Sequence, residues 1–206
     1  MVDLYIARHG QTIWNVQKRM QGRLDSSLTK KGVEDAKRLR EYLADTPFDE
    51  VISSPSGRAY TTAKLIRPNE TNMTTDPRLM EIHLGKWQGK TDDEIHREFP
   101  SEYDHYWNAP ERYDNDGGET FTDVITRVED FLQEIERTYV EGRVLIVTHG
   151  VAIMAFLSIV KNLSLKNFWS GPISEGTSLT LIRLEKGERK LLVEGSVEHL
   201  SLVTVQ

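Results

Sequence analysis

Apolar residues follow two alternating patterns along this 206-residue chain. Short apolar runs predict strands buried in a sheet at residues 2–7 and 144–148, and "EVISS" at 50–54 is expected to be another strand. A spacing of three or four apolar residues predicts amphipathic helices at 30–45 and 121–139, and helices are also expected at 57–66 and 151–161. Two more strands are expected near 177–184 and 190–197. The alternation predicts a three-layer α/β fold, a mostly parallel sheet with helices on both faces and room for an antiparallel edge.

A segment rich in aromatic residues interrupts this alternation. Thr91 and Glu94 form a T-x-x-E capping box, which predicts a short helix near 92–99. Residues 100–118 are rich in Tyr, Trp, Pro and Asn. The sequence shows no internal repeat or linker. We therefore expect one domain over residues 1–206, with a small helical and loop cap inserted at about 91–118.

Composition removes several classes of function. A formal net charge of −6 argues against nucleic-acid binding, which needs a basic surface. The absence of cysteine excludes disulfides, iron–sulfur clusters and thiol catalysis. No apolar run reaches the roughly 18 residues of a membrane span, and the first residues lack the layout of a signal peptide. We expect a cytoplasmic protein that does not bind membranes.

Two of the predicted strands end in the same pair of residues. His9-Gly10 follows the first strand, and His149-Gly150 follows the strand at 144–148. In an open α/β sheet, ligands bind beyond the carboxyl ends of the strands. A glycine there lets the backbone approach a ligand, and the next helix offers free N–H groups to an anion. If the two strands are neighbours, both imidazoles converge on one crevice.

Two arginines also lie close to the ends of predicted strands. Arg8 precedes His9, and Arg58 follows the strand and turn "ISSPSG". A lone histidine at a strand end is more often structural, and a lone arginine in the first turn of a helix is usually solvated. Together, however, they suit phosphoryl transfer, because a neutral imidazole is a nucleophile and guanidinium groups stabilise phosphoryl oxygens. Glu81, one of many glutamates, is the candidate that protonates the leaving group.

With these residues assembled, the sequence resembles the histidine phosphatase superfamily, also called phosphoglycerate mutase-like. The signature R-H-G occurs at residues 8–10 and continues with "QTIWN" and "MQGRLDSSLTKKG". Later motifs follow in the expected order: "SSPSGRAYTTA", "EIHLGKWQGKT", "GGETFTDVITRV" and "VLIVTHG". Gln11 and Ser27 depart from the glutamate and proline common in the family, outside the chemical core.

The resemblance implies a role for each matching residue. His9 would be the nucleophile, Arg8, Arg58 and His149 would bind the phosphoryl oxygens, and Glu81 would act as acid and base. The expected substrate-binding residues are Arg8, Asn15, Gln21, Gly22, Arg58, His83, which is two residues from Glu81, and Gly150. No cofactor or metal is implied. The spacing of His83, His96 and His105 fits no metal motif, and "GKWQGKT" lacks the four residues between glycines of a Walker loop.

The closest similarity within the superfamily is to bacterial broad-specificity phosphatases of the PhoE type. It implies a metal-independent hydrolase of small phosphate monoesters that forms a phosphohistidine, in a monomer or small homo-oligomer. A phosphoglycerate mutase is the alternative, and a non-catalytic phospho-ligand-binding module is a more remote one. The aromatic residues of 99–113 allow two interpretations: an apolar cap tolerant of varied leaving groups, or packing of the insertion onto the sheet.

Overall fold

One mixed sheet forms the centre of the molecule in the computed structural model, which describes residues 1–71, 73–172 and 176–201. Its six described strands have the order β3-β2-β4-β1-β5-β6. The three pairings from β3 to β1 are parallel, and β5 and β6 add an antiparallel edge. The strands are β1 (Val2–Arg8), β2 (Glu50–Ser53), β3 (Thr74–Thr75), β4 (Gly142–Thr148), β5 (Leu179–Glu185) and β6 (Glu188–Ser196).

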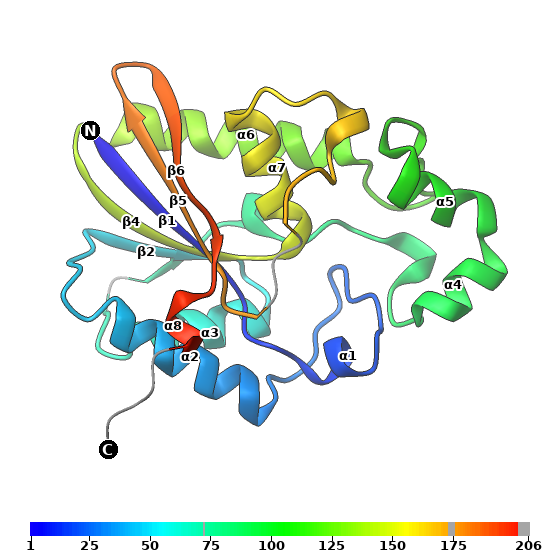
Figure 1. Ribbon diagram of the computed structural model, residues 1–206, viewed down its shortest axis with the longest axis horizontal. Helices are drawn as coiled ribbons and strands as arrows, with labels where there is room; N and C mark the ends of the chain where they lie inside the picture. Colours follow the sequence, from blue (N-terminus) through cyan, green and yellow to red (C-terminus); the bar gives the residue numbers. More distant parts are fainter. Residues whose placement is uncertain (72, 173–175, 202–206) are drawn as a thin grey trace.

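Helices cover both faces of this sheet, as Figure 1 shows: α6 and α7 lie on one side, and α2, α3 and α8 on the other. The α-helices are α1 (Ile13–Val16), α2 (Lys30–Tyr42), α3 (Gly57–Ile66), α4 (Asp92–Glu98), α5 (Pro100–Asn108), α6 (Phe121–Thr138), α7 (Gly150–Val160) and α8 (Glu198–Ser201). Short 3-10 turns are η1 (Pro77–Leu79), η2 (Gly85–Trp87), η3 (Pro110–Arg112) and η4 (Leu165–Asn167). The predicted three-layer α/β fold is therefore confirmed.

The continuous apolar runs of the central strands follow from this layering. Successive side chains of a strand point to opposite faces of the sheet. In β4, Val144 and Ile146 pack with α6 and α7 in one buried cluster. Leu145 and Val147 pack in a second cluster, with residues of α2 and α3. Both faces are buried there, so the four positions 144–147 are all apolar.

Capping residues explain where several helices begin. Thr91 and Thr120 each accept a hydrogen bond from the backbone N–H three residues later, and Glu94 and Asp123 complete the reciprocal boxes. Thr29 caps α2 in the same way, through the N–H of Gly32. These side chains fix the first turns of α2, α4 and α6 close to the positions predicted from the sequence.

Five short elements were not predicted: α1, β3, η3, η4 and α8. Each has four residues or fewer, which is too short for a hydrophobic period to show. The segment 78–89, predicted as an irregular loop, contains the last two residues of η1 and all of η2. Among the described residues, no helix has the length and hydropathy that a membrane span needs.

Aromatic residues of the segment 87–113 pack against one another and against Phe121 of α6. Trp87, Tyr106 and Tyr113 are buried in the same cluster as Phe121 of α6. Ring centroids of Tyr106 and Phe121 are 5.1 Å apart, and those of Trp87 and Tyr106 are 5.5 Å apart. Of the two interpretations of this segment, the structure supports packing of the insertion onto the sheet.

Candidate active site

The parallel pairing of β1 with β4 brings the two His-Gly sequences together. Arg8 lies opposite Thr148 at the end of the ladder, and the N–H of His9 donates to the carbonyl of Thr148 over 2.9 Å. The two imidazoles therefore leave the sheet side by side. Their ring centroids are 5.2 Å apart. The convergence expected from the two strand ends is thus present in the fold.

The buried His9 ring is held in one tautomer by its neighbour. Its Nδ1 lies 2.8 Å from the carbonyl oxygen of Gly10, which can only accept a hydrogen bond. The proton is therefore on Nδ1, and the lone pair is on Nε2. The N–H of Gly10 donates to Oγ1 of Thr62 over 3.0 Å. A Cβ on Gly10 would lie 2.5 Å from the carbonyl oxygen of Gly32, so the turn requires glycine.

Arg58 comes from the first turn of α3 and is 2% exposed. Its Nη2 donates to the carbonyl of Gly22 over 2.9 Å and lies 3.1 Å from Nδ1 of His149. Its Nη1 donates to the carbonyl of Leu24 and to the carboxylate of Asp25. Its buried Nε has no hydrogen-bond partner in the described part of the chain. The guanidinium is thus fixed on one side and has a buried donor left for a ligand.

Glu81 comes from the segment between η1 and η2, and its carboxylate lies beside the N-terminus of α7. Both of its carboxylate oxygens are within hydrogen-bond distance of the N–H of Val151, at 3.2 and 3.3 Å, and Oε1 also accepts from Ile82. A Cβ placed on Gly150 would lie 3.7 Å from Oε2 of Glu81 and 3.9 Å from Nε of Arg8. Gly150 therefore separates an acidic from a basic side chain, with no side chain of its own between them.

Burial and fixed positive charge keep both imidazoles neutral. The pKa of His9 is well below 6.5, first because burial disfavours the charged ring and then because Arg58 and Arg8 are near. The pKa of His149 is lowered by burial, by Arg58, and also by His9, Arg8 and Arg127. A neutral His9 with its lone pair on Nε2 has the state that a nucleophile needs.

These lowered pKa values predict an unusual pH dependence. Because folded His9 and His149 remain neutral below pH 6.5 while unfolded histidine takes up a proton there, the unfolded state binds more protons. The free energy of unfolding is therefore expected to fall as the pH drops from 7 towards 5. The value of kcat/KM, in contrast, should show no titration of the enzyme near 6.5, only that of the ester, whose second pKa is about 6. Urea unfolding and pH–rate profiles measure both; an acid limb of kcat/KM at 6.5 that stays in place for esters of different second pKa would contradict the neutral-nucleophile assignment.

A cavity of about 360 Å³ opens beside Arg8 and His9. Arg8, His9 and Asn15 line it together with Gln11, Lys31, Gly176, Val197 and Leu200. Oδ1 of Asn15 accepts from the N–H and Oγ1 of Thr12, so the orientation of its amide is fixed. The cavity has a cationic wall formed by Arg8 and Lys31 and a small apolar wall formed by Val197 and Leu200.

The other predicted site residues lie as follows. Gly22 has a φ of +54° and joins the site through its backbone carbonyl, which Arg58 binds. Gln21 is buried, and its Oε1 has no partner among the described residues. The N–H of His83 donates to Glu119 over 2.8 Å, and its carbonyl accepts from the N–H of Glu119. Neither Gln21 nor His83 is among the described residues that line the cavity around His9.

Some site residues were missed at the sequence level. Thr62 supports the turn at Gly10, and Ser54 contacts the ring of His149. Asp25 holds Arg58 from a loop remote in sequence. Ser54 had a visible signal, a polar residue directly after a buried strand. Thr62 and Asp25 carried none, because their partners are 52 and 33 residues away.

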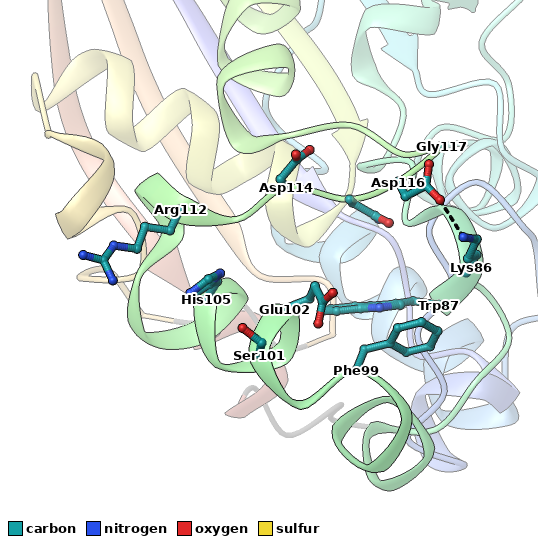
Figure 2. A pocket seen from close by; sticks show the side chains of 11 residues that line it. Lys86, Trp87, Phe99, Ser101, Glu102, His105, Arg112, Asp114, Asp116 and Gly117 are labelled. Carbon is teal, nitrogen blue, oxygen red and sulfur yellow. Dashed lines mark hydrogen bonds and ion pairs between the residues drawn. The ribbon is translucent and has the colours of Figure 1, made fainter.

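A second cavity, of about 740 Å³, lies on the cap (Figure 2). Trp87 and Phe99 form its apolar part, while most of the other residues that line it are polar or charged. Figure 2 shows the ion pair between Lys86 and Asp116, 2.6 Å long, at one end of the cavity. None of the predicted site residues lines this second cavity. No described cluster of histidine and acidic side chains has the arrangement of a metal site.

Known proteins are similar to this chain over most of its length. The family profile described as "Histidine phosphatase superfamily (branch 1)" matches residues 4–195. The solved structure of Bacillus stearothermophilus YhfR is 43% identical, covers 97% of this chain and 100% of its own, and has a TM-score of 0.93. Phosphoserine phosphatase 1 of Hydrogenobacter thermophilus is 29% identical over 97% of this chain and 95% of its own length. The probable phosphoglycerate mutase GpmB of Yersinia pestis is 31% identical over 79% of this chain and 76% of its own.

Proposed function

Because the chain belongs to branch 1 of the histidine phosphatase superfamily, we propose that it hydrolyses small phosphate monoesters through a phosphohistidine formed on His9. One observation carries the proposal: a neutral His9, with its lone pair on Nε2, lies within 5.2 Å of a second imidazole, ring centre to ring centre. The buried guanidinium of Arg58 lies beside His149, and Arg8 directly precedes His9. That combination suits attack on phosphorus and stabilisation of the transferred group.

The reaction proceeds in two steps. In the first, Nε2 of His9 attacks phosphorus, the bond to the ester oxygen breaks, and Glu81 gives a proton to the leaving alkoxide. In the second, Glu81 takes a proton from water, the water attacks phosphorus, and the P–N bond breaks to release phosphate. The N–H of Val151 keeps the carboxylate of Glu81 in place during both steps.

The arginines supply charge where the transition state needs it. Arg58 has a buried Nε donor, and its two Nη atoms are fixed by carbonyls and by Asp25, so little reorganisation is needed when a phosphoryl group binds. Arg8 lines the cavity beside His9. Asn15 would donate its amide N–H groups to the same oxygens. Gln21, Gly22 and His83 are proposed to act at the edge of this site, and Gly150 lets Glu81 approach it.

A mutase reaction is the second candidate, since one relative is a probable phosphoglycerate mutase. In a mutase the phosphohistidine passes its phosphoryl group to a bound phosphoglycerate rather than to water. Incubation with 3-phosphoglycerate separates the two: a hydrolase releases inorganic phosphate, and a mutase produces 2-phosphoglycerate. Predominant formation of 2-phosphoglycerate would overturn the hydrolase proposal.

A substrate profile tests both the proposed chemistry and its breadth. We expect phosphate release from aryl, alkyl and sugar phosphates, unchanged by EDTA, and an acid-labile phosphoryl group trapped on His9. Activity confined to one sugar phosphate would end the broad-specificity part of the proposal. Failure to trap phosphate on a histidine, with turnover intact, would end the covalent mechanism.

Replacing Glu81 with glutamine is expected to separate substrates by their leaving groups. An alkyl phosphate, whose alkoxide needs a proton, should lose about 100-fold or more in kcat/KM. Nitrophenyl phosphate should lose far less, because nitrophenolate leaves without protonation. The control is Glu98→Gln, at an exposed carboxylate paired with Lys90. Equal losses for both esters in Glu81→Gln would contradict the acid role.

A further inference from the structure

The imidazole of His149 has a neighbour at each ring nitrogen, and together they fix its proton. Nη2 of Arg58 lies 3.1 Å from Nδ1, and a guanidinium can only donate, so Nδ1 carries a lone pair. The proton is therefore on Nε2. It points to Oγ of Ser54 at 2.7 Å, the shortest hydrogen bond of this ring.

Ser54 is built to accept that bond. Its side chain is fully buried at the end of β2, on the strand adjacent to β4. The N–H of Ser56 also approaches Oγ of Ser54, at 3.4 Å, and the Ser54 hydroxyl is directed to Oγ of Ser56 at 3.5 Å. Oγ of Ser56 is in addition 3.3 Å from Nε2 of His149. The side-chain donors thus run from Arg58 through His149 to Ser54 and Ser56, while the backbone N–H of Ser56 donates back to Ser54.

A lone pair on Nδ1 has a consequence for phosphate binding. In this state His149 accepts from Arg58 and has no N–H at Nδ1 to offer to a phosphoryl oxygen. A phosphate monoester has a second pKa of about 6, so near neutral pH part of it carries a proton. Transfer of that proton to Nδ1 breaks an O–H bond and forms an N–H bond. It leaves a phosphate dianion facing an imidazolium.

We propose that Ser54 is a positioning residue for this proton transfer. It holds His149 as the Nε2–H tautomer in the free protein, and it accepts the same hydrogen bond from the imidazolium that forms when phosphate binds. Protonated Nδ1 then donates to a phosphoryl oxygen during transfer to His9. The inference rests on the proposed function, and it assigns the task to a residue outside the R-H-G and H-G motifs.

The charges around His149 explain why such an acceptor is needed. Arg58, His9, Arg8 and Arg127 all disfavour a positive charge on the ring, and burial does so most. Asp25 offsets part of the Arg58 charge through its ion pair. In the complex the phosphate supplies negative charge on the Nδ1 side. On the Nε2 side the acceptors are the two serine hydroxyls, of which Ser54 is the nearer.

Nitrogen NMR of the full chain labelled at histidine tests the tautomer without turnover. In the free protein we expect His149 to carry its proton on Nε2, and saturation with inorganic phosphate should protonate Nδ1. In Ser54→Ala the free ring should keep the Nε2–H tautomer, because Arg58 still donates to Nδ1 and the Ser56 hydroxyl is still near Nε2, but phosphate should protonate Nδ1 at lower pH only. An Nδ1–H tautomer in the free wild-type protein, or protonation of Nδ1 by phosphate at an unchanged pH in Ser54→Ala, would overturn the proposal.

Kinetics provide the second readout, with a matched control next door. Ser53 is equally buried, but its hydroxyl donates to the carbonyl of Ser54 and is not the acceptor for the N–H of His149. Ser54→Ala should lower kcat by about 100-fold and move the alkaline limb of the kcat profile down by about one pH unit, because the imidazolium loses its acceptor. Ser53→Ala should leave the position of that limb unchanged.

Two outcomes separate this proposal from the proposed function. If Ser54→Ala does not fold, judged by circular dichroism, the isosteric Ser54→Cys takes its place, because sulfur is a weak acceptor. If the protein hydrolyses no ester while phosphate still protonates Nδ1 in a Ser54-dependent way, the positioning role stands and the hydrolase proposal fails. If hydrolysis is normal in both Ser54 variants, with an unmoved alkaline limb, the positioning role fails alone.

Discussion

Replacing His9 with alanine is expected to abolish release of phosphate from every ester, a loss of about 10⁴-fold or more in kcat. The reason is that only His9 combines a lone pair on Nε2 with a position beside the second imidazole. The measurement is single-turnover phosphate release, together with loss of the acid-labile phosphoryl label.

The fold should survive this substitution. The ring is at the end of β1, outside both apolar clusters, so alanine removes one hydrogen bond to Gly10 and a small buried volume. Inorganic phosphate should still bind, since Arg8, Arg58 and His149 remain, and calorimetry can measure this. His96→Ala, at an exposed position on α4, is the control. Residual turnover of His9→Ala above 1% of the wild-type rate would exclude His9 as the nucleophile.

The sequence predicts the centre of the fold and of the site for one physical reason. Strands buried on both faces must be continuously apolar, so β1 and β4 are visible, and the polar residues that end them stand out. The prediction that His9 and His149 converge required only that these two strands be neighbours. The order of the strands in the sheet cannot be derived from these local patterns. In the structure, β1 pairs directly with β4, which makes the two strands neighbours.

Other features depend on tertiary contacts that leave no local pattern. The short helix α1 begins at the capping residue Thr12. The short helix α8 is held by tertiary contacts of His199 and Leu200. Neither helix is long enough to show a hydrophobic period. The tautomer of His149 follows from Arg58 and Ser54, which reach it from α3 and β2. The sequence left two interpretations of the aromatic residues at 99–113 open, because it does not show whether their rings line a substrate cavity or pack into the core. Burial of Tyr106 in the common cluster favours packing.

The site combines a fixed cation with two neutral imidazoles in a buried space. Burial alone would make Arg58 costly, and it lowers the pKa of that guanidinium, while Glu81 and Asp25 act in the opposite direction. Three backbone and side-chain acceptors, from Gly22, Leu24 and Asp25, hold the group. The guanidinium is thereby fixed beside His149.

Replacing Arg58 with alanine is therefore expected to have two consequences of different size. The rate should fall by about 10³-fold or more for good and poor leaving groups alike, because the charge that opposes the developing phosphoryl charge is lost. The loop at residues 22–25 loses its anchor as well, so unfolding in urea should occur at a lower midpoint. Arg58→Lys should restore part of the stability but little of the rate, because lysine keeps the charge and lacks the fork that spans His149 and the carbonyls.

Arg183→Ala is the matched control for this loss. Arg183 is held by two hydrogen bonds to Asp3, near the opposite end of β1, so its removal costs an ion pair without touching the site. It should retain the wild-type kcat. Rates for alkyl and aryl phosphates, measured beside the urea midpoint, distinguish electrostatic from structural damage in Arg58→Ala. If Arg58→Lys recovers both rate and stability fully, the geometry of the fork is irrelevant, and a positive charge at this position is sufficient.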